Sequence, residues 1–309
     1  MSDMPILRLG TRRSPLAMAQ AEEARARLCA AHGWDVGSVE LVPVIASGDK
    51  IQDRPLADIG GKALWTRELD MWLAEGRIDA SVHSMKDVET IRPDEISFGA
   101  ILPRADKADV LLGAASIAAI AKGAKVGTSA PRRAAQLLHA RPDVEVVGIR
   151  GNVATRMAKL AAGEVDATFL AGAGLSRLGE DGVGVRLDPE AWFPAPAQAA
   201  IGIECRTSDE RTAEVLSAID HAPSRQEVMA ERALLEGLGG TCHSPIAVLT
   251  VRSGDIIEMR AQIFSPDGAH RVEGEAHFAP DDTAAAIALA HDLLARAPDA
   301  VAINFGQSL

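Results

Sequence analysis

Hydrophobic runs and helical patterns alternate through the first part of the chain. Short apolar runs predict strands at Ile6–Leu9, Val39–Ala46, Ile78–Val82 and Ile96–Leu102. Ser14 and Pro15 suit the start of a helix that runs to Gly33, and a second helical pattern extends from Lys62 to about Glu75. This alternation predicts an α/β layer with parallel strands.

The middle of the chain repeats the same order of elements. Lys125–Gly127 leads into a helical pattern that ends at Ala140, and the apolar run Val144–Ile149 leads into another helix. Asp79-Ala80-Ser81 and Asp166-Ala167-Thr168 both follow a helix and a glycine, at the start of a strand. We therefore expect two related α/β domains rather than a short-period repeat.

The C-terminal part has a different pattern. A helix is expected at about Ser224–Glu236, and a final helix from about Asp282 to Arg296. Alternating strands are expected near Ile246–Val251, Ile256–Phe264 and Arg271–Phe278. Turn residues at Ser253-Gly254-Asp255 and Pro266-Asp267-Gly268 separate these strands as hairpins. The segment is predicted to be a small α+β domain.

Composition narrows the classes of function. A chain of 309 residues suits two or three domains, and its net charge of −11 argues against nucleic-acid binding. Aromatic residues make up only 3% and tyrosine is absent, which also disfavours base stacking. Neither a signal-type stretch nor a membrane-spanning run is visible, so we expect no export and no membrane partner. The three cysteines lack zinc-ligand spacing and indicate a reducing compartment, the cytoplasm.

Two arginine-bearing turns stand out against this acidic background. Gly10-Thr11-Arg12-Arg13-Ser14-Pro15 and Gly127-Thr128-Ser129-Ala130-Pro131-Arg132-Arg133 each combine a glycine, hydroxyl groups, a proline and two arginines. Each turn lies where a strand leads into a helix, so unpaired backbone N–H groups and the positive end of the helix dipole gather there. We expect both turns to bind anionic groups.

Further cations follow other predicted strands. The full set at or just after strand ends is Arg12, Arg13, Lys86, Arg132, Arg133, Arg150, Arg156 and Arg177. Each alone is typical of a solvated surface, but together they indicate a ligand with several carboxylates. Ligands of open α/β sheets bind beyond the carboxyl ends of the strands, so a shared cleft is the expected place.

Two other features could carry chemistry. Cys242 lies in a loop with two glycines before it and Pro245 after it, whereas Cys29 and Cys205 fall in helix and strand patterns that indicate core positions. The residues alone leave Cys242 open between a buried filler and a nucleophile. The adjacent Lys86 and Asp87 could be an anion contact and an acid/base group, or a solvated loop pair.

These motifs together resemble the porphobilinogen deaminase family. The likeness is carried by Val126–Arg133, Arg150–Arg156, His83–Asp87 and the glycine-flanked Cys242, and it extends from Leu7 into the last domain. It implies two domains similar to type II periplasmic binding proteins around a cleft, and a small C-terminal α+β domain. The implied domains are residues 1–101 with 199–219, residues 102–198, and residues 220–309.

The resemblance also implies an activity and a cofactor. Members of the family, also called hydroxymethylbilane synthases, add four porphobilinogen units to a dipyrromethane primer with release of ammonia. Hydrolysis then frees the linear tetrapyrrole hydroxymethylbilane. The primer is held through a thioether to the cysteine that corresponds to Cys242, and the family suggests a monomer.

By the same resemblance, Asp87 is the catalytic residue. Expected cofactor-binding residues are Ser84, Lys86, Thr128, Arg132, Arg133 and Arg156. Expected substrate-binding residues are Arg12, Ser14, Lys62, Arg150, Arg177 and Gln198. The chain departs from the family pattern at Asp58, Trp65, Ala130 and Ala197-Gln198-Ala199-Ala200.

Two alternatives stay open from the sequence. A non-catalytic anion-binding protein of periplasmic-binding architecture would explain the paired α/β domains and the arginines, but it gives no role to the C-terminal domain or its loop cysteine. A catalytically impaired family member is motivated by Asp58 and Ala130.

Overall fold

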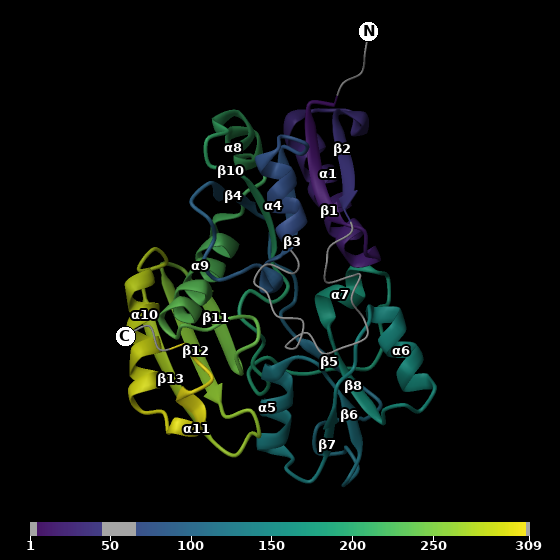
Figure 1. Ribbon diagram of the computed structural model, residues 1–309, viewed down its shortest axis with the longest axis vertical. Helices are drawn as coiled ribbons and strands as arrows, with labels where there is room; N and C mark the ends of the chain where they lie inside the picture. The colour runs from purple at the N-terminus through teal and green to yellow at the C-terminus, as the bar shows by residue number, and fades with distance from the viewer. Residues whose placement is uncertain (1–4, 45–65, 307–309) are drawn as a thin grey trace. The chain divides into compact units, whose positions relative to one another are not determined.

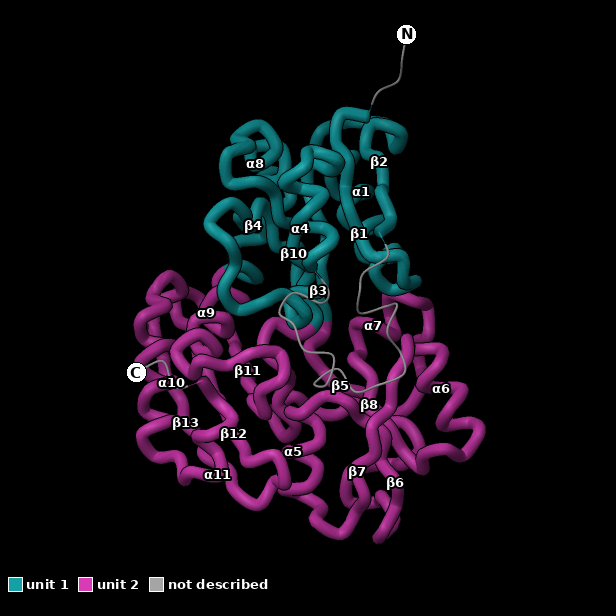
Figure 2. The backbone as a smooth tube through the Cα atoms, in the orientation of Figure 1, with its two compact units in different colours: residues 1–105, 199–225 teal, residues 106–198, 226–309 magenta. Residues whose placement is uncertain are grey.

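The computed structural model describes residues 5–44 and 66–306 (Figure 1). Its chain forms two compact units, which Figure 2 colours separately: residues 1–105 with 199–225, and residues 106–198 with 226–309. The chain therefore leaves the first unit at residue 105 and returns to it at residue 199.

The first unit is built on a five-stranded sheet in the order β2-β1-β3-β10-β4. Its strands are β1 (Leu7–Arg12), β2 (Val39–Val44), β3 (Ala80–Ser84), β4 (Ile96–Ile101) and β10 (Ile201–Arg206). Its helical elements are α1 (Pro15–His32), η1 (Val36–Ser38), α4 (Arg67–Ala74), η2 (Met85–Asp87) and α8 (Glu210–Ser217). Helices α1 and α8 share one apolar core with the sheet, and α4 packs in a separate core that includes Ile78.

Helix α1 begins and ends where its sequence predicts. The Ser14 side chain accepts a hydrogen bond from the backbone N–H of Ala17, and Pro15 occupies the first helical position. Gly33 ends the helix in the left-handed conformation at φ 65°, which glycine adopts without steric cost. The first turn of α1 carries no acidic residue, so nothing in it offsets the positive end of the helix dipole.

The second unit contains a five-stranded sheet in the order β7-β6-β8-β5-β9. Its strands are β5 (Asp109–Leu112), β6 (Lys125–Gly127), β7 (Glu145–Val147), β8 (Ala167–Ala171) and β9 (Val185–Arg186). Its helices are α5 (Pro131–Ala140), α6 (Val153–Ala161) and α7 (Gly172–Arg177). In each sheet one strand, β10 or β5, is inserted antiparallel between its neighbours.

Corresponding residues of the two five-stranded sheets have the same strand register and hydrogen bonds. Gly10 pairs with Ser81 across parallel strands in the first sheet, and Gly127 pairs with Thr168 in the second. The Asp79 carboxylate accepts from the backbone N–H of Arg8 at 2.8 Å, and the Asp166 carboxylate accepts from that of Lys125 at 2.7 Å. The predicted relation between the two α/β halves is confirmed by this shared register.

The C-terminal part, within the second unit, forms a three-stranded antiparallel sheet. It comprises β11 (Ile246–Ser253), β12 (Ile256–Phe264) and β13 (Arg271–Phe278) with α9 (Ala222–Gly237), α10 (Thr283–Ala295) and α11 (Asp299–Ala302). Helices α9 to α11 share one core with this sheet, and a second cluster joins Phe264 to Ala135 of α5. The predicted α/β and α+β fold class is therefore confirmed by the described sheets.

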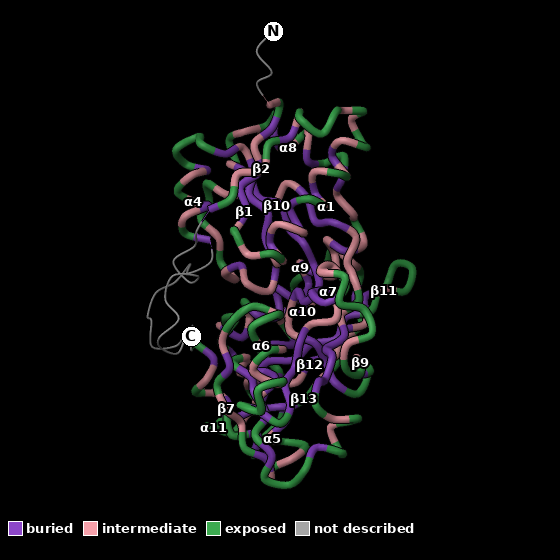
Figure 3. The backbone as a smooth tube through the Cα atoms, turned by 90° about the vertical axis from the view of Figure 1, so that its right-hand side faces the viewer, coloured by how far each residue is buried: buried purple, intermediate pink, exposed green. Residues whose placement is uncertain are grey.

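Burial differs among the elements (Figure 3). Five of the six residues of β10 are buried, whereas α6 has none.

Details of the strands differ from expectation. Strand β1 continues through Arg12 instead of ending at Leu9, because Gly10–Arg12 pair with β2. Strands β5 and β9 were not predicted, since runs of four and two residues give little periodicity. The start of the expected helix at Lys62 lies outside the described residues.

Candidate functional site

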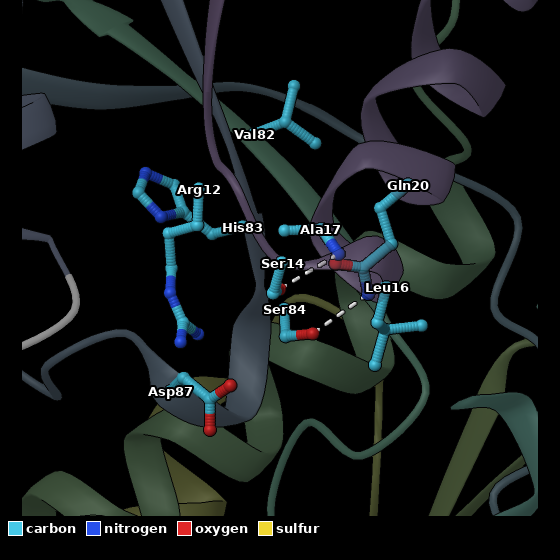
Figure 4. Close-up of a pocket in the computed structure, with 9 residues that line it drawn as sticks. All are labelled: Arg12, Ser14, Leu16, Ala17, Gln20, Val82, His83, Ser84 and Asp87. Atoms are coloured by element: carbon cyan, nitrogen blue, oxygen red, sulfur yellow. Dashed lines mark hydrogen bonds between the residues drawn. The ribbon is translucent and has the colours of Figure 1, made fainter. Parts of the chain in front are cut away.

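A pocket lies at the carboxyl ends of β1 and β3, beside the first turn of α1 (Figure 4). Its volume is ≈ 50 Å³ and it is lined by Arg12, Ser14, Leu16, Ala17, Gln20, Val82, His83, Ser84 and Asp87. Four of the residues predicted from the sequence, Arg12, Ser14, Ser84 and Asp87, are thus brought together within the first unit. This volume exceeds the roughly 10–15 Å³ that one water needs, so a small polar group such as a carboxylate can enter the pocket.

Hydroxyl groups in this pocket are oriented by their neighbours. Ser14 Oγ accepts from the N–H of Ala17 at 3.3 Å, and Ser84 Oγ accepts from Nε2 of Gln20 at 2.8 Å. Both bonds are dashed in Figure 4. Because each oxygen accepts in these bonds, each hydroxyl hydrogen remains available for donation to another partner. With a helix N-terminus and the Arg12 guanidinium, these groups favour an anion.

One carboxylate complements these donors. Asp87 ends the short helix η2, and the Arg12 side chain points toward it in Figure 4. The neighbouring Lys86 is half-buried and is not among the pocket-lining residues. Arg13, by contrast, is exposed. The pocket therefore offers donors for an anion and one acidic group that can hold a cation or a proton.

A buried histidine forms part of the pocket wall. His83 Nε2 lies 2.9 Å from Ser81 Oγ and 3.2 Å from Oε2 of Glu204, which is fully buried on β10. Burial pushes the pKa of Glu204 up, but the hydrogen bond from His83 and the charge of the Arg92 guanidinium outweigh burial, so this pKa lies below its usual value. Glu204 is consequently ionised at neutral pH.

The second arginine turn is built differently from the first. Thr128 is buried and its Oγ1 accepts from the N–H of Ala130, while Ser129 Oγ donates to the carbonyl of Ile149. No side chain caps the N-terminus of α5, whose first turn includes Arg132 and Arg133.

Both of these arginines are buried against one carboxylate. Asp109 Oδ2 accepts from Nη1 of Arg132 at 2.5 Å, and Asp109 Oδ1 accepts from Nη2 of Arg133 at 2.7 Å. Trp192 Nε1 also donates to Asp109, at 3.0 Å. Burial alone would raise the pKa of Asp109, yet the two guanidinium charges hold it far below its usual range. The three ionised groups together carry one net positive charge.

Gln198 completes this cluster. Its Oε1 accepts from Nη2 of Arg132 at 3.1 Å, and its Nε2 donates to Asp109 Oδ1 at 2.9 Å. The flanking residues Ala197 and Ala199 have φ values of 56° and 71°, a conformation that costs an L-residue roughly 1–2 kcal/mol. Gln198 therefore lies between two residues of strained backbone, where the chain passes from the second unit to the first.

Three further predicted arginines belong to the second unit and are half-buried. Arg150 precedes α6, Arg177 ends α7, and Arg156 Nε donates to the carbonyl of Gly151 at 3.0 Å. Asn152 caps α6 by accepting from the N–H of Thr155. Lys62, the remaining predicted substrate contact, lies outside the described residues.

Cys242 lies in an exposed turn between α9 and β11. The turn is closed by the N–H of Thr241 donating to Ser244 Oγ at 3.0 Å, and the N–H of Ser244 donating to the carbonyl of Thr241 at 3.0 Å. None of the three cysteines forms a disulfide bond, and Cys205 is buried while Cys29 is half-buried. The exposure of Cys242 disfavours its reading as a core filler.

Sequence reasoning missed the residues that position this chemistry. Asp109, Trp192, Glu204 and Gln20 were not singled out, because each acts through partners that are distant in the sequence. Within residues 5–44 and 66–306, no group of three or more His, Cys, Asp or Glu side chains could hold a metal ion. In the same residues, no helix is long and apolar enough to cross a membrane.

Two five-stranded α/β sheets and a pocket rich in hydrogen-bond donors define the class, an α/β protein whose pocket suits an anionic group. Comparison with known proteins identifies the family. The model described as "Porphobilinogen deaminase, dipyromethane cofactor binding domain" matches residues 7–214, and that of "Porphobilinogen deaminase, C-terminal domain" matches residues 225–296. The chain belongs to the porphobilinogen deaminase family, whose members are transferases.

Two curated relatives are similar over nearly the whole chain. Porphobilinogen deaminase of Sphingopyxis alaskensis is 54% identical over 301 residues, which is 96% of this chain and 95% of the relative. That of Paracoccus denitrificans is 46% identical over 296 residues, 94% of this chain and 95% of the relative. A solved structure, the periplasmic VFT2 domain of BvgS from Bordetella pertussis, is 16% identical with a TM-score of 0.41, over 75% of this chain and 94% of that one.

Proposed function

We propose that the protein is a hydroxymethylbilane synthase. It condenses four porphobilinogen molecules head to tail onto a dipyrromethane primer, releases ammonia at each step, and hydrolyses the product to hydroxymethylbilane. The observation that carries this proposal is the pocket that joins Arg12, Ser14, Ser84 and Asp87. Porphobilinogen carries two carboxylates and an aminomethyl group, and this pocket pairs donors for the former with an acid for the latter.

A substrate carboxylate is bound by the donors around the first arginine turn. Arg12 supplies positive charge, the Ser14 hydroxyl group supplies a hydrogen, and the N-terminus of α1 adds its dipole. Each charge-assisted hydrogen bond contributes on the order of 1.5–3 kcal/mol. The pocket volume of ≈ 50 Å³ gives room for a carboxylate.

Asp87 acts on the reacting end of the substrate. As ammonia leaves, positive charge develops at the methylene carbon, and a carboxylate stabilises it by charge. After the carbon–carbon bond forms, the attacked ring must lose a proton, and the same carboxylate accepts it.

The second arginine turn fits the carboxylates of the dipyrromethane cofactor. Arg132 Nε is buried and has no hydrogen-bond partner among residues 5–44 and 66–306, so this N–H lacks an acceptor there. The cluster of Arg132, Arg133 and Asp109 has a net positive charge and lies at the N-terminus of α5, which no side chain caps. It therefore suits an added carboxylate. When bound, the cofactor supplies the pyrrole end onto which substrate is added.

We assign the remaining contacts from the family resemblance. Cys242 anchors the cofactor through a thioether, which its exposed turn permits. Thr128 and Arg156, with Lys86 and Ser84, contact the cofactor. Arg150, Arg177, Gln198 and Lys62 contact substrate or the growing chain. Gln198 is also hydrogen-bonded to Arg132.

The domain boundaries remain our prediction: residues 1–101 with 199–219, residues 102–198, and residues 220–309. One sheet in each segment supports them. A cytoplasmic location is supported by three cysteines without a disulfide bond. The monomer is proposed from the family resemblance alone.

Intact mass of the purified protein tests the covalent cofactor. In a host that makes porphobilinogen, the wild-type chain should carry the added mass of two linked pyrroles, and Cys242→Ser should lack it. Cys29→Ala is the matched control, because its thiol is half-buried in α1, and it should keep the added mass. An unmodified wild-type chain contradicts the proposal.

Substitution of Asp87 tests the acid/base role. Asp87→Ala should keep the thermal unfolding midpoint and lower kcat by about 100-fold or more, the usual contribution of such a group. The control is the exposed Asp94→Ala, which should keep the wild-type kcat. Wild-type turnover in Asp87→Ala would refute the acid/base role of Asp87. The two alternatives, a catalytically impaired family member and a non-catalytic anion-binding protein, would then remain.

A further inference from the structure

We propose that His83 is a second acid/base group of the condensation site, oriented by Glu204, and that it takes from Asp87 the proton released at each addition. This inference rests on the proposed function, because it assigns a residue to that reaction. It concerns a buried histidine and a buried carboxylate that the family resemblance left without a role.

The sheet register places the two residues on one face. Ser81 and His83 are two positions apart on β3 and so project to the same side. Glu204 on β10 lies opposite Ser81, and Gly202 lies opposite His83. The space beside Gly202 is occupied by the Met85 side chain, so no β10 side chain lies directly opposite His83.

The contacts of Glu204 determine which ring nitrogen of His83 carries a hydrogen. Glu204 is ionised and can only accept. Nε2 of His83, 3.2 Å from Oε2 of Glu204, must therefore donate. Nδ1 is then the position at which the ring gains or loses a proton, and within the described residues it has no hydrogen-bond partner. The ring itself lines the pocket together with Arg12 and Asp87 (Figure 4).

The charges behind Glu204 favour a protonated ring as a transient state. Arg92 Nε donates to Oε1 of Glu204 at 2.8 Å, and the same guanidinium contacts Asp70 at 2.6 Å and Glu89 at 2.9 Å. One guanidinium thus faces three carboxylates, so the cluster has an excess of negative charge. A buried carboxylate that holds a histidine in one tautomer and stabilises its imidazolium is an established catalytic arrangement.

The proton transfer balances. The attacked pyrrole carbon loses its hydrogen to a carboxylate oxygen of Asp87, and the electrons of the C–H bond restore the aromatic ring. The new O–H bond then breaks, its electrons stay on Asp87, and the Nδ1 lone pair binds the proton. The imidazolium passes this proton to the ammonia released in the same addition, which leaves as ammonium. Asp87 is then a carboxylate again and can accept the next proton.

The tautomer can be measured on the wild-type protein without activity. Imidazole ¹⁵N NMR, with His83→Gln to assign the signal among eight histidines, should show neutral His83 with its hydrogen on Nε2. In Glu204→Gln that tautomer should lose its preference. A wild-type ring with its hydrogen on Nδ1, or one that stays imidazolium throughout the pH range of activity, overturns the proposal.

Kinetics test the role in turnover. His83→Gln should lower kcat about 10- to 100-fold with little change in KM, a contribution at or below the low end for a general acid/base. It should also remove the fall of kcat on the acid side of the pH profile. Glu204→Gln should move that fall to lower pH, because it removes negative charge that favours the imidazolium. If His83 had only a structural role, the pH profile of the residual activity would not change.

Controls separate this proposal from the proposed function. His32→Gln is the matched control, since His32 is also hydrogen-bonded in the first unit but stacks on Trp34 outside the pocket, and it should keep the wild-type kcat. If the wild type condenses porphobilinogen and folded His83→Gln keeps its kcat and pH profile, His83 has no such role while the enzyme assignment stands. If the wild type carries no cofactor and makes no tetrapyrrole, the enzyme assignment fails, and the NMR result still decides the tautomer.

Discussion

Asp109 and Arg132 form a buried ion pair in which the carboxylate oxygen Oδ2 lies 2.5 Å from Nη1 of the guanidinium. Arg133 contacts the other oxygen of the same carboxylate, at 2.7 Å. The second arginine turn therefore presents one net positive charge instead of two. Its geometry is fixed by an internal carboxylate before any ligand binds, which reduces the cost of ordering two long side chains.

Asp109→Asn should destabilise the protein by about 3–5 kcal/mol, because it leaves two buried guanidinium groups without their carboxylate. Urea unfolding at pH 7 measures the change. The control is Asp143→Asn, which breaks a partly exposed pair with Arg141 and should have a much smaller effect. Equal effects of the two substitutions would contradict a dominant role for the buried pair.

The effect of Asp109→Asn on the unfolding free energy should depend on pH. The folded-state pKa of Asp109 is held far below its usual range, so its stabilisation is present above the unfolded pKa, about 3.9, and is lost as pH falls below that value. The difference in unfolding free energy between wild type and Asp109→Asn should be constant from about pH 7 to 5 and narrow below about pH 4. A difference that grows on acidification would reverse the expected sign.

The strained segment around Gln198 predicts a stabilising change. Ala197→Gly and Ala199→Gly should each raise the unfolding free energy by up to about 1 kcal/mol, since glycine adopts positive φ without a Cβ clash. Ala200→Gly is the matched control: it is buried in the same segment without positive φ, and it should be destabilising. Destabilisation by all three substitutions would show that the alanine methyl groups outweigh the strain.

Gly268, in the hairpin between β12 and β13, is a position where we expect only glycine to be tolerated. A Cβ at Gly268 would lie 2.4 Å from the backbone nitrogen of His139 in α5, at φ +71°. Gly268→Ala should cost about 2–4 kcal/mol, from backbone strain plus overpacking. Gly254→Ala has a similar φ of +61° with nothing within 4 Å, so it should cost only the strain, about 1 kcal/mol. Equal losses in thermal unfolding would argue against the contact.

Arg150→Ala should impair elongation more than stability. Loss of one charge-assisted contact costs about 1.5–3 kcal/mol, roughly 10- to 100-fold in kcat/KM. Mass spectrometry of the enzyme should show chains that stall before four added units. Arg13→Ala is the control, because Arg13 is exposed and should leave elongation unchanged. A large loss of thermal stability with normal elongation would contradict the assignment.

Local patterns of the sequence determined much of the fold. The start and end of α1 follow from Ser14, Pro15 and Gly33, whose backbone preferences act within a few residues. Strands β6, β12 and β13 have the predicted bounds. The sequence also placed Arg12, Ser14, Ser84 and Asp87 at the ends of parallel strands, and these ends meet at one edge of a sheet.

Only the tertiary structure decided which side chains hold the charged groups. Gln198 is hydrogen-bonded to Asp109, 89 positions away in the sequence, and Arg92 to Glu204, 112 positions away. The two buried carboxylates belong to β5 and β10, the strands inserted antiparallel into the two five-stranded sheets. Their neighbours are set by the pairing of strands from distant segments, which depends on the packing of whole sheets. The sequence thus determined where arginines and acids could act, and the fold decided which of them are already paired.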